Sequence, residues 1–130
     1  MELVEGRDPD LPGAELRVIR EQCGLTLDQF GRLAQVKGTS VRTWELSHKL
    51  LIPKDVADIA RELHTMLLGF KQSILDQYAD CEPGDDVTLL LYQRESFSGP
   101  WHEMLVYNSA VGLAYHELVD DGLNAWIVWA

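Results

Sequence analysis

The chain has 130 residues, 46% of them hydrophobic, which is enough apolar material for one compact domain or a small domain with an appended dimerisation element. No run approaches the roughly 18 uninterrupted apolar residues of a membrane span, and the first residues lack the basic-then-apolar order of a signal peptide, so the sequence predicts a cytoplasmic protein. Two distant cysteines without metal-ligand spacing predict free thiols and no metal site.

The net charge of −10 is distributed unevenly along the chain. From residue 53 onward, four basic residues stand against 13 acidic ones. Between Arg17 and Lys49, six basic residues stand against three acidic ones, a net charge of +3. Affinity for nucleic acid comes largely from replacing phosphate counterions with lysine and arginine, so this segment alone suits a phosphate backbone.

The N-terminal third of the chain predicts a tail and three short helices. Two prolines and a glycine among acidic residues predict a loose tail over residues 1–13. Thr26 stands three residues before Gln29, the capping-box pattern that opens a helix. Apolar residues at helical spacing complete the prediction. The expected helices cover 14–23, 27–34 and 39–45.

The rest of the chain predicts a long helix followed by a small mixed element. Pro53 opens an apolar stripe that continues to Tyr78. After an acidic Pro-Gly break, the run 87–92 is β-prone and apolar on both faces, which predicts a buried strand. A helix over 104–118 and a strand over 125–129, able to pair with the first strand, complete the chain.

These elements predict a mainly α fold of the α+β kind, with an N-terminal helical bundle, a long connecting helix and a small C-terminal strand-helix-strand element. The expected domain bounds are 1–13 for the tail, 14–80 for the helical domain with its long helix, and 81–130 for the small α/β domain.

The segment LTLDQFGRLAQVKGTSVRTWE, residues 25–45, resembles the helix-turn-helix domains of the XRE/Cro family without a gap. Gly31 falls where the two helices of the unit approach each other, and Val41 and Trp44 fall on the inner face of the second helix. The family usually has glycine where this chain has Gln35, so either Gln35 tolerates strain or the turn differs. Lys37 replaces the usual Ser or Thr cap, which moves the expected cap to Thr39.

A narrower resemblance covers nearly the whole chain. A helix-turn-helix, then Ile52–Val56 opening a long helix, then a strand, then the sequence SAVGLAY at 109–115, is similar to the anti-CRISPR-associated regulators of phages and mobile elements and their YdiL-like bacterial relatives. This resemblance implies that the N-terminal half binds an inverted DNA repeat and that the C-terminal half forms a homodimer.

Residues left pointing outward from the second helix of the unit, with neighbouring cations, are the expected nucleic-acid contacts. Arg42 is the candidate for reading guanine, because its guanidinium donates two hydrogen bonds to N7 and O6. The alternative is a surface arginine that pairs with phosphate or with Glu45. Thr39, Ser40 and Thr43 either contact the DNA or merely cap and solvate the helix. The full expected set is Arg17, Lys37, Gly38, Thr39, Ser40, Arg42, Thr43, His48 and Lys49.

Large apolar residues gather in the second half, which has little interior of its own. We expect some of them at a dimer interface, the alternative being an intramolecular core. The expected interface residues are Leu89, Leu91, Tyr92, Trp126 and Val128.

The sequence therefore predicts a homodimeric repressor that binds double-stranded DNA at an operator such as its own promoter. Two alternatives stay open: an antitoxin-like or phage protein-interaction module, and RNA binding through the same basic face. No nucleophile-base pair, phosphate loop or paired metal ligands has a recognisable spacing, so we expect neither an enzyme nor a cofactor.

Overall fold

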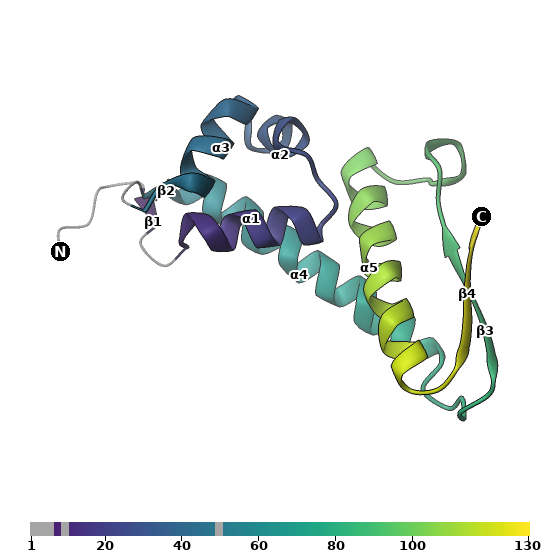
Figure 1. Cartoon of the computed structure of the whole chain (residues 1–130). Helices are drawn as coiled ribbons and strands as arrows, with labels where there is room; N and C mark the ends of the chain where they lie inside the picture. Colours follow the sequence, from purple (N-terminus) through teal and green to yellow (C-terminus); the bar gives the residue numbers. More distant parts are fainter. Residues whose placement is uncertain (1–6, 9–10, 49–50) are drawn as a thin grey trace. The chain divides into compact units, whose positions relative to one another are not determined.

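The computed structural model describes the backbone of residues 7–8 and the whole of residues 11–48 and 51–130 (Figure 1). This part of the chain is mostly helical. It divides into two compact units, Met1–Thr65 and Met66–Ala130, and the boundary falls inside the longest helix, α4 (Lys54–Gln77). None of the described helices is long and apolar enough to cross a membrane.

The first unit contains three short helices that precede α4 (Figure 1). They are α1 (Gly13–Gln22), α2 (Leu27–Ala34) and α3 (Gly38–Leu46). The predicted start of α2 is confirmed: the Gln29 backbone N–H donates to Thr26 Oγ1 at 3.1 Å, and the Thr26 backbone N–H donates to Gln29 Oε1 at 2.9 Å. This reciprocal pair satisfies two backbone groups that the helix end leaves without partners.

A tight turn joins α2 to α3. Gln35 adopts the left-handed conformation with φ 59° and ψ 41°, and the Val36 backbone N–H donates to the Gly31 carbonyl at 2.9 Å. A Cβ on Gly31 would lie 2.6 Å from the Val36 carbonyl oxygen, so only glycine fits there. Of the two possibilities for Gln35, the structure shows a strained glutamine in the left-handed position.

The start of α3 differs from the prediction. The helix begins at Gly38, one residue early, and its cap position is Lys37, whose side chain makes no capping hydrogen bond. The expected cap at Thr39 is therefore wrong, because Thr39 already lies in the first turn. A Cβ on Gly38 would overlap the Asp28 carboxylate, which shows how closely α3 approaches the start of α2.

The expected loose tail is wrong at several of its residues. Arg7–Asp8 (β1) pair antiparallel with Ile52–Pro53 (β2), Leu11 is buried, and α1 already begins at Gly13. Prolines and acidic residues are uncommon in strands, so this short pairing was not predicted from the sequence. Pro53 accordingly belongs to β2, and the long helix begins one residue later.

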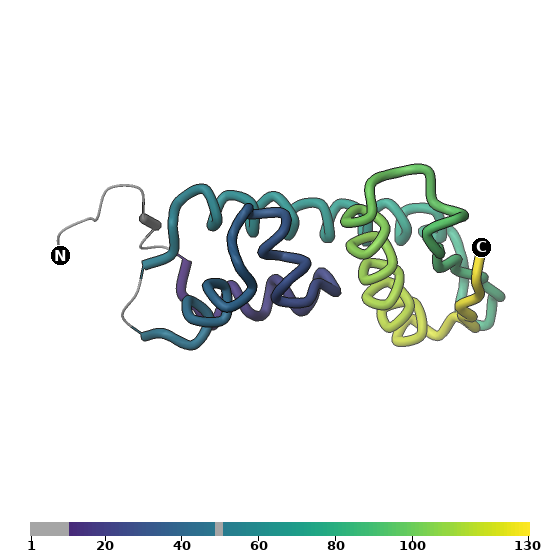
Figure 2. Tube along the Cα trace, turned by 90° about the horizontal axis from the view of Figure 1, so that it is seen from above, coloured from purple at the N-terminus to yellow at the C-terminus, as the bar shows by residue number. Residues whose placement is uncertain are grey.

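The second unit contains the end of α4, two strands and a helix between them. β3 (Asp86–Leu91) and β4 (Asn124–Trp129) pair in parallel, which confirms that the terminal run pairs with the first strand. The helix α5 (Trp101–Asp120), preceded by the short 3-10 helix η1 (Arg94–Ser96), extends beyond the expected 104–118 at both ends. Figures 1 and 2 show α5 along one side of the two strands.

The prediction that β3 is buried on both faces is wrong. Val87 and Leu89 are buried, whereas Thr88 and Leu90 are exposed. Strand residues alternate between the two faces, and α5 covers only one of them, so the apolar residues on the other face remain at the surface. Apolar composition alone does not reveal how many faces of a strand are covered.

Candidate nucleic-acid interface

The helix α3 divides sharply into an inner and an outer face. On the inner face, Val41 is buried and Trp44 is half-buried, as the sequence predicts. Glu45 is buried beside them. The outer face presents Thr39, Arg42, Thr43 and Leu46 to solvent, with Ser40 half-buried beside them. Of the other expected contacts, Arg17, Lys37 and His48 are exposed, Gly38 is buried against α2, and Lys49 lies outside the described residues.

A buried ion pair joins α1 to the end of α3. Arg20 donates from Nε to Glu45 Oε2 at 2.6 Å and from Nη2 to Glu45 Oε1 at 3.0 Å, and a third bond runs from Nη1 to the Leu25 carbonyl at 2.8 Å. Only 9% of Arg20 and 7% of Glu45 is exposed. The two-pronged geometry satisfies both carboxylate oxygens, so the charges compensate each other inside the unit.

This ion pair also excludes one of the alternatives for Arg42. Because Arg20 occupies both oxygens of Glu45, the alternative in which Arg42 pairs with Glu45 is wrong. Arg42 is exposed, and no ion pair joins it to any residue that the structure describes. The Arg20–Glu45 pair was not predicted, although Arg20 falls on the apolar stripe of its helix, where a charged residue indicates a buried partner.

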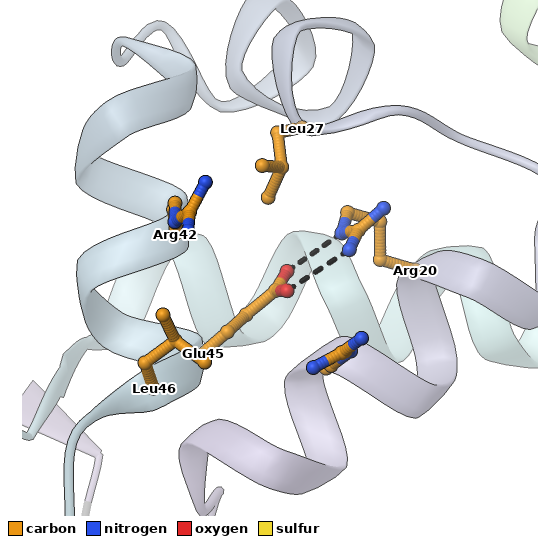
Figure 3. A pocket seen from close by; sticks show the side chains of 6 residues that line it. Arg20, Leu27, Arg42, Glu45 and Leu46 are labelled. Atoms are coloured by element: carbon orange, nitrogen blue, oxygen red, sulfur yellow. Dashed lines mark hydrogen bonds and ion pairs between the residues drawn. The ribbon is translucent and has the colours of Figure 1, made fainter.

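The basic side chains of α1 and α3 surround a small pocket. Its volume is about 230 Å³, and its lining consists of Arg17, Arg20, Leu27, Arg42, Glu45 and Leu46. Figure 3 shows Arg42 projecting from α3 beside the Arg20–Glu45 pair. Since Glu45 neutralises Arg20 and Glu21 pairs with Arg17, the pocket presents its unpaired positive charge to solvent through Arg42.

Arg17, unlike Arg42, has an ion-pair partner. Its Nε donates to Glu21 Oε1 at 2.9 Å within α1, and both side chains are more than half exposed. The hydrogen bond from Arg17 lowers the pKa of the Glu21 carboxyl, so the pair stays charged at neutral pH. Such exposed pairs are weak and are screened by salt, so Arg17 can exchange Glu21 for a phosphate at small cost.

Thr43 has a local partner that limits its role. Its hydroxyl donates to the Thr39 backbone carbonyl at 2.9 Å, one turn earlier in α3. The hydroxyl proton is therefore already used, and the side chain offers an oxygen acceptor and a methyl group. A thymine methyl or a donor on a base edge is the contact that remains possible for this geometry.

The residues expected at a dimer interface lie on both faces of the β3–β4 pair. Leu89 is buried in the core of its own unit, and Leu91 is half-buried on the same side. The Tyr92 ring packs edge-on against Phe97 and Tyr107, with ring centres 5.6 Å apart in each case. Trp126 and Val128 are 54% and 45% exposed on the opposite face.

The cysteines and histidines are possible metal ligands, because their side chains are the ones that bind zinc. Within residues 11–48 and 51–130, no cluster of three histidine, cysteine or acidic side chains is placed to hold a metal ion. Cys23 is a buried free thiol whose pKa is raised to about 11 by burial, and Cys81 is a half-buried free thiol.

No protein-family model matches the chain, and no curated protein is significantly similar to it in sequence.

Proposed function

We propose that the chain is a transcriptional regulator that binds double-stranded DNA by placing α3 in the major groove. The α2–turn–α3 segment acts as a helix-turn-helix, and α1 supports it through the Arg20–Glu45 pair. The protein works as a homodimeric repressor that occupies an inverted repeat, since one short helix reads only a few base pairs and a two-fold pair doubles the site.

One observation carries the proposal: the outer face of α3 presents an exposed, unpaired arginine among small hydroxyl side chains, and the acidic residue of the helix is turned inward and neutralised. Arg42, Thr39 and Thr43 are exposed, and Glu45 is held by Arg20. A helix in the major groove needs donors for base edges and no exposed carboxylate facing the phosphates.

Roles follow from position. Arg42 reads a guanine, Thr39 and Ser40 contact neighbouring bases or phosphates, and Thr43 contacts a thymine methyl or a base-edge donor. Lys37 at the start of α3 and His48 after its end bind phosphates on either side, together with Arg17 and Lys49. Arg42 thus carries sequence specificity, whereas the flanking cations carry affinity that is independent of sequence.

The test is a binding titration on the duplex upstream of the protein's own gene, with a scrambled duplex of equal length as competitor. Arg42→Ala should weaken binding to the specific duplex by roughly 5- to 150-fold, the equivalent of about 1–3 kcal/mol, and binding to the scrambled duplex much less. The matched control is Arg94→Ala, which removes one exposed arginine from the second unit and should change neither affinity by more than twofold.

Wild-type protein that binds no duplex at low salt contradicts the proposal and favours a protein-interaction module. Displacement of the duplex by the gene's own leader transcript at equal concentration contradicts it in favour of RNA binding.

A further inference from the structure

The second unit contains a pocket bounded by the end of α4, β3 and α5. Its volume is about 200 Å³, and all of its lining residues belong to residues 66–130. Ile74, Leu89 and Val111 are its buried apolar residues. Pockets for drug-sized ligands measure about 300–1,000 Å³, so this one admits only a small molecule.

Three half-buried tyrosines line this pocket together: Tyr78, Tyr92 and Tyr107. Tyr78 directly follows the end of α4, Tyr92 directly follows β3, and Tyr107 lies in α5. The chain has four tyrosines, so the fold brings three of them to one place and leaves Tyr115 outside the pocket lining. We call Tyr78, Tyr92 and Tyr107 the tyrosine cluster.

Ring packing and hydrogen bonds hold the tyrosine cluster in position. The Tyr107 ring packs edge-on against that of Tyr92, with ring centres 5.6 Å apart. The Asn108 side chain accepts from the Tyr92 backbone N–H at 2.9 Å and donates to the Tyr92 carbonyl at 2.8 Å. The Tyr78 hydroxyl donates to the Thr88 carbonyl at 3.3 Å. A pocket whose walls are fixed in this way loses little conformational entropy when a ligand enters.

The tyrosine cluster is uncharged at neutral pH. Burial raises the pKa of Tyr107 above its ordinary value, and the nearby hydroxyls of Tyr92 and Tyr78 raise it further, because a phenolate there would lose hydration and would repel a second phenolate. This mutual influence also indicates that the three phenol oxygens lie near one another. The pocket therefore offers aromatic rings and neutral oxygen atoms.

The edge of β3 beside this pocket supplies further hydrogen-bond acceptors. β3 pairs with β4 along its other edge, where the Leu91 carbonyl accepts from the Ala130 backbone N–H at 2.8 Å. Successive carbonyls of a strand point to opposite edges, so the Thr88 and Leu90 carbonyls point away from β4. The Tyr78 hydroxyl meets the Thr88 carbonyl on that side, and both Thr88 and Leu90 line the pocket.

Charge decides which small molecule suits this pocket. None of the residues that line it is charged, and the second unit has ten acidic residues against two basic ones, Lys71 and Arg94. A small anion is repelled by this unit and finds no cation in the pocket. A small cation is attracted by the unit, and tyrosine rings attract a cation through the negative charge of their faces.

We propose that this pocket binds a small organic ammonium cation, with the tyrosine cluster around the charged group and Ile74, Leu89 and Val111 against its apolar groups. A methylated nitrogen suits such walls, because aromatic rings replace its weak hydration without a carboxylate. A metal ion does not suit them, since magnesium and calcium take carboxylate oxygens as ligands. The inference goes beyond the proposed function and does not depend on DNA binding.

The experiment is a nuclear magnetic resonance titration of the full chain with choline chloride at constant ionic strength. Choline should bind with a Kd below about 1 mM. The matched probe is 3,3-dimethyl-1-butanol, in which carbon replaces the charged nitrogen at nearly the same size. This neutral alcohol should bind about tenfold more weakly or less, because it has no charge for the tyrosine rings to attract.

Two variants separate the ring from the hydroxyl. Tyr107→Leu removes the ring and should weaken choline binding by about tenfold or more, whereas Tyr107→Phe keeps the ring and should change it by less than about threefold. The matched control is Tyr115→Leu, which removes a half-buried tyrosine of the same helix that does not line the pocket and should leave binding unchanged. Circular dichroism melts show whether each variant is folded.

If Tyr107→Leu fails to fold, Tyr78→Leu and the comparison of choline with its neutral analogue decide instead. Three outcomes would overturn the proposal: no binding of choline at about 10 mM, equal affinity for choline and the alcohol, or unchanged affinity in the folded leucine variant of the tyrosine cluster. A chain that binds DNA but not choline contradicts this inference alone, and a chain that binds choline but no DNA contradicts the proposed function alone.

Discussion

Gln35 is the residue at which the chain stores backbone strain. It is the only non-glycine residue with positive φ among the described residues, and it closes the turn between α2 and α3. A side chain in the left-handed region costs about 1–2 kcal/mol, because Cβ crowds the neighbouring carbonyl. The hydrogen bond from Val36 to Gly31 and the packing of the two helices hold it in place.

Gln35→Gly should therefore raise the free energy of unfolding by about 0.5–1 kcal/mol, since relief of the strain exceeds the extra entropy that glycine loses on folding. Chemical denaturation measures the change. Gln35→Val is the matched control and should lower stability by about 1 kcal/mol or more, because a β-branched residue tolerates positive φ least. Equal stability of the glycine and valine variants would show that the turn is not strained.

At the scale of the element, the Arg20–Glu45 pair is what holds α3 against α1. Both groups are buried, and each satisfies the other's charge. The Arg17–Glu21 pair lies on the surface of α1 nearby and shows the contrast, because water solvates both of its charges. Of these two pairs, only the buried one connects two elements, so it positions α3 against α1.

Glu45→Ala should destabilise the chain by about 3–5 kcal/mol, because it leaves the Arg20 guanidinium buried without a counter-charge. The double variant Arg20→Met with Glu45→Leu should recover most of that loss, since packed apolar side chains replace the ions. Thermal or denaturant unfolding measures both variants. A small loss for Glu45→Ala, similar to that for Glu21→Ala on the surface, would contradict a structural role for the pair.

At the scale of the whole molecule, the net charge of −10 works against the compact state. Most of the excess is in residues 66–130. Self-repulsion of this kind is screened within about 10 Å at 0.1 M salt and within about 3 Å at 1 M.

We therefore expect the melting temperature to rise by several degrees between 20 and 500 mM NaCl at pH 7, measured by circular dichroism at one protein concentration. Trp126→Lys, which places a charge at a residue expected in the dimer interface, serves as the control, because a rise that persists in this variant reports repulsion within one chain. A melting temperature that stays constant or falls with salt in both proteins would mean that the acidic residues do not repel one another appreciably.

Local sequence determined most of the elements of this protein. The Thr26–Gln29 capping pattern, the apolar spacing of α2 and the long stripe of α4 are short-range signals, because hydrogen bonds and helix periodicity depend on residues within a few positions of one another. The outward set on α3 was predicted for the same reason, apart from Gly38, which the approach of Asp28 buries.

Only the tertiary structure decided which partner each side chain takes and which faces are covered. The pairing of Arg20 with Glu45, the short β1–β2 pairing and the parallel β3–β4 pairing join residues 25 to 46 positions apart in sequence. Neither composition nor periodicity encodes such distances, because they depend on how the elements pack. That packing buries Glu45 and leaves Arg42 and Trp126 at the surface.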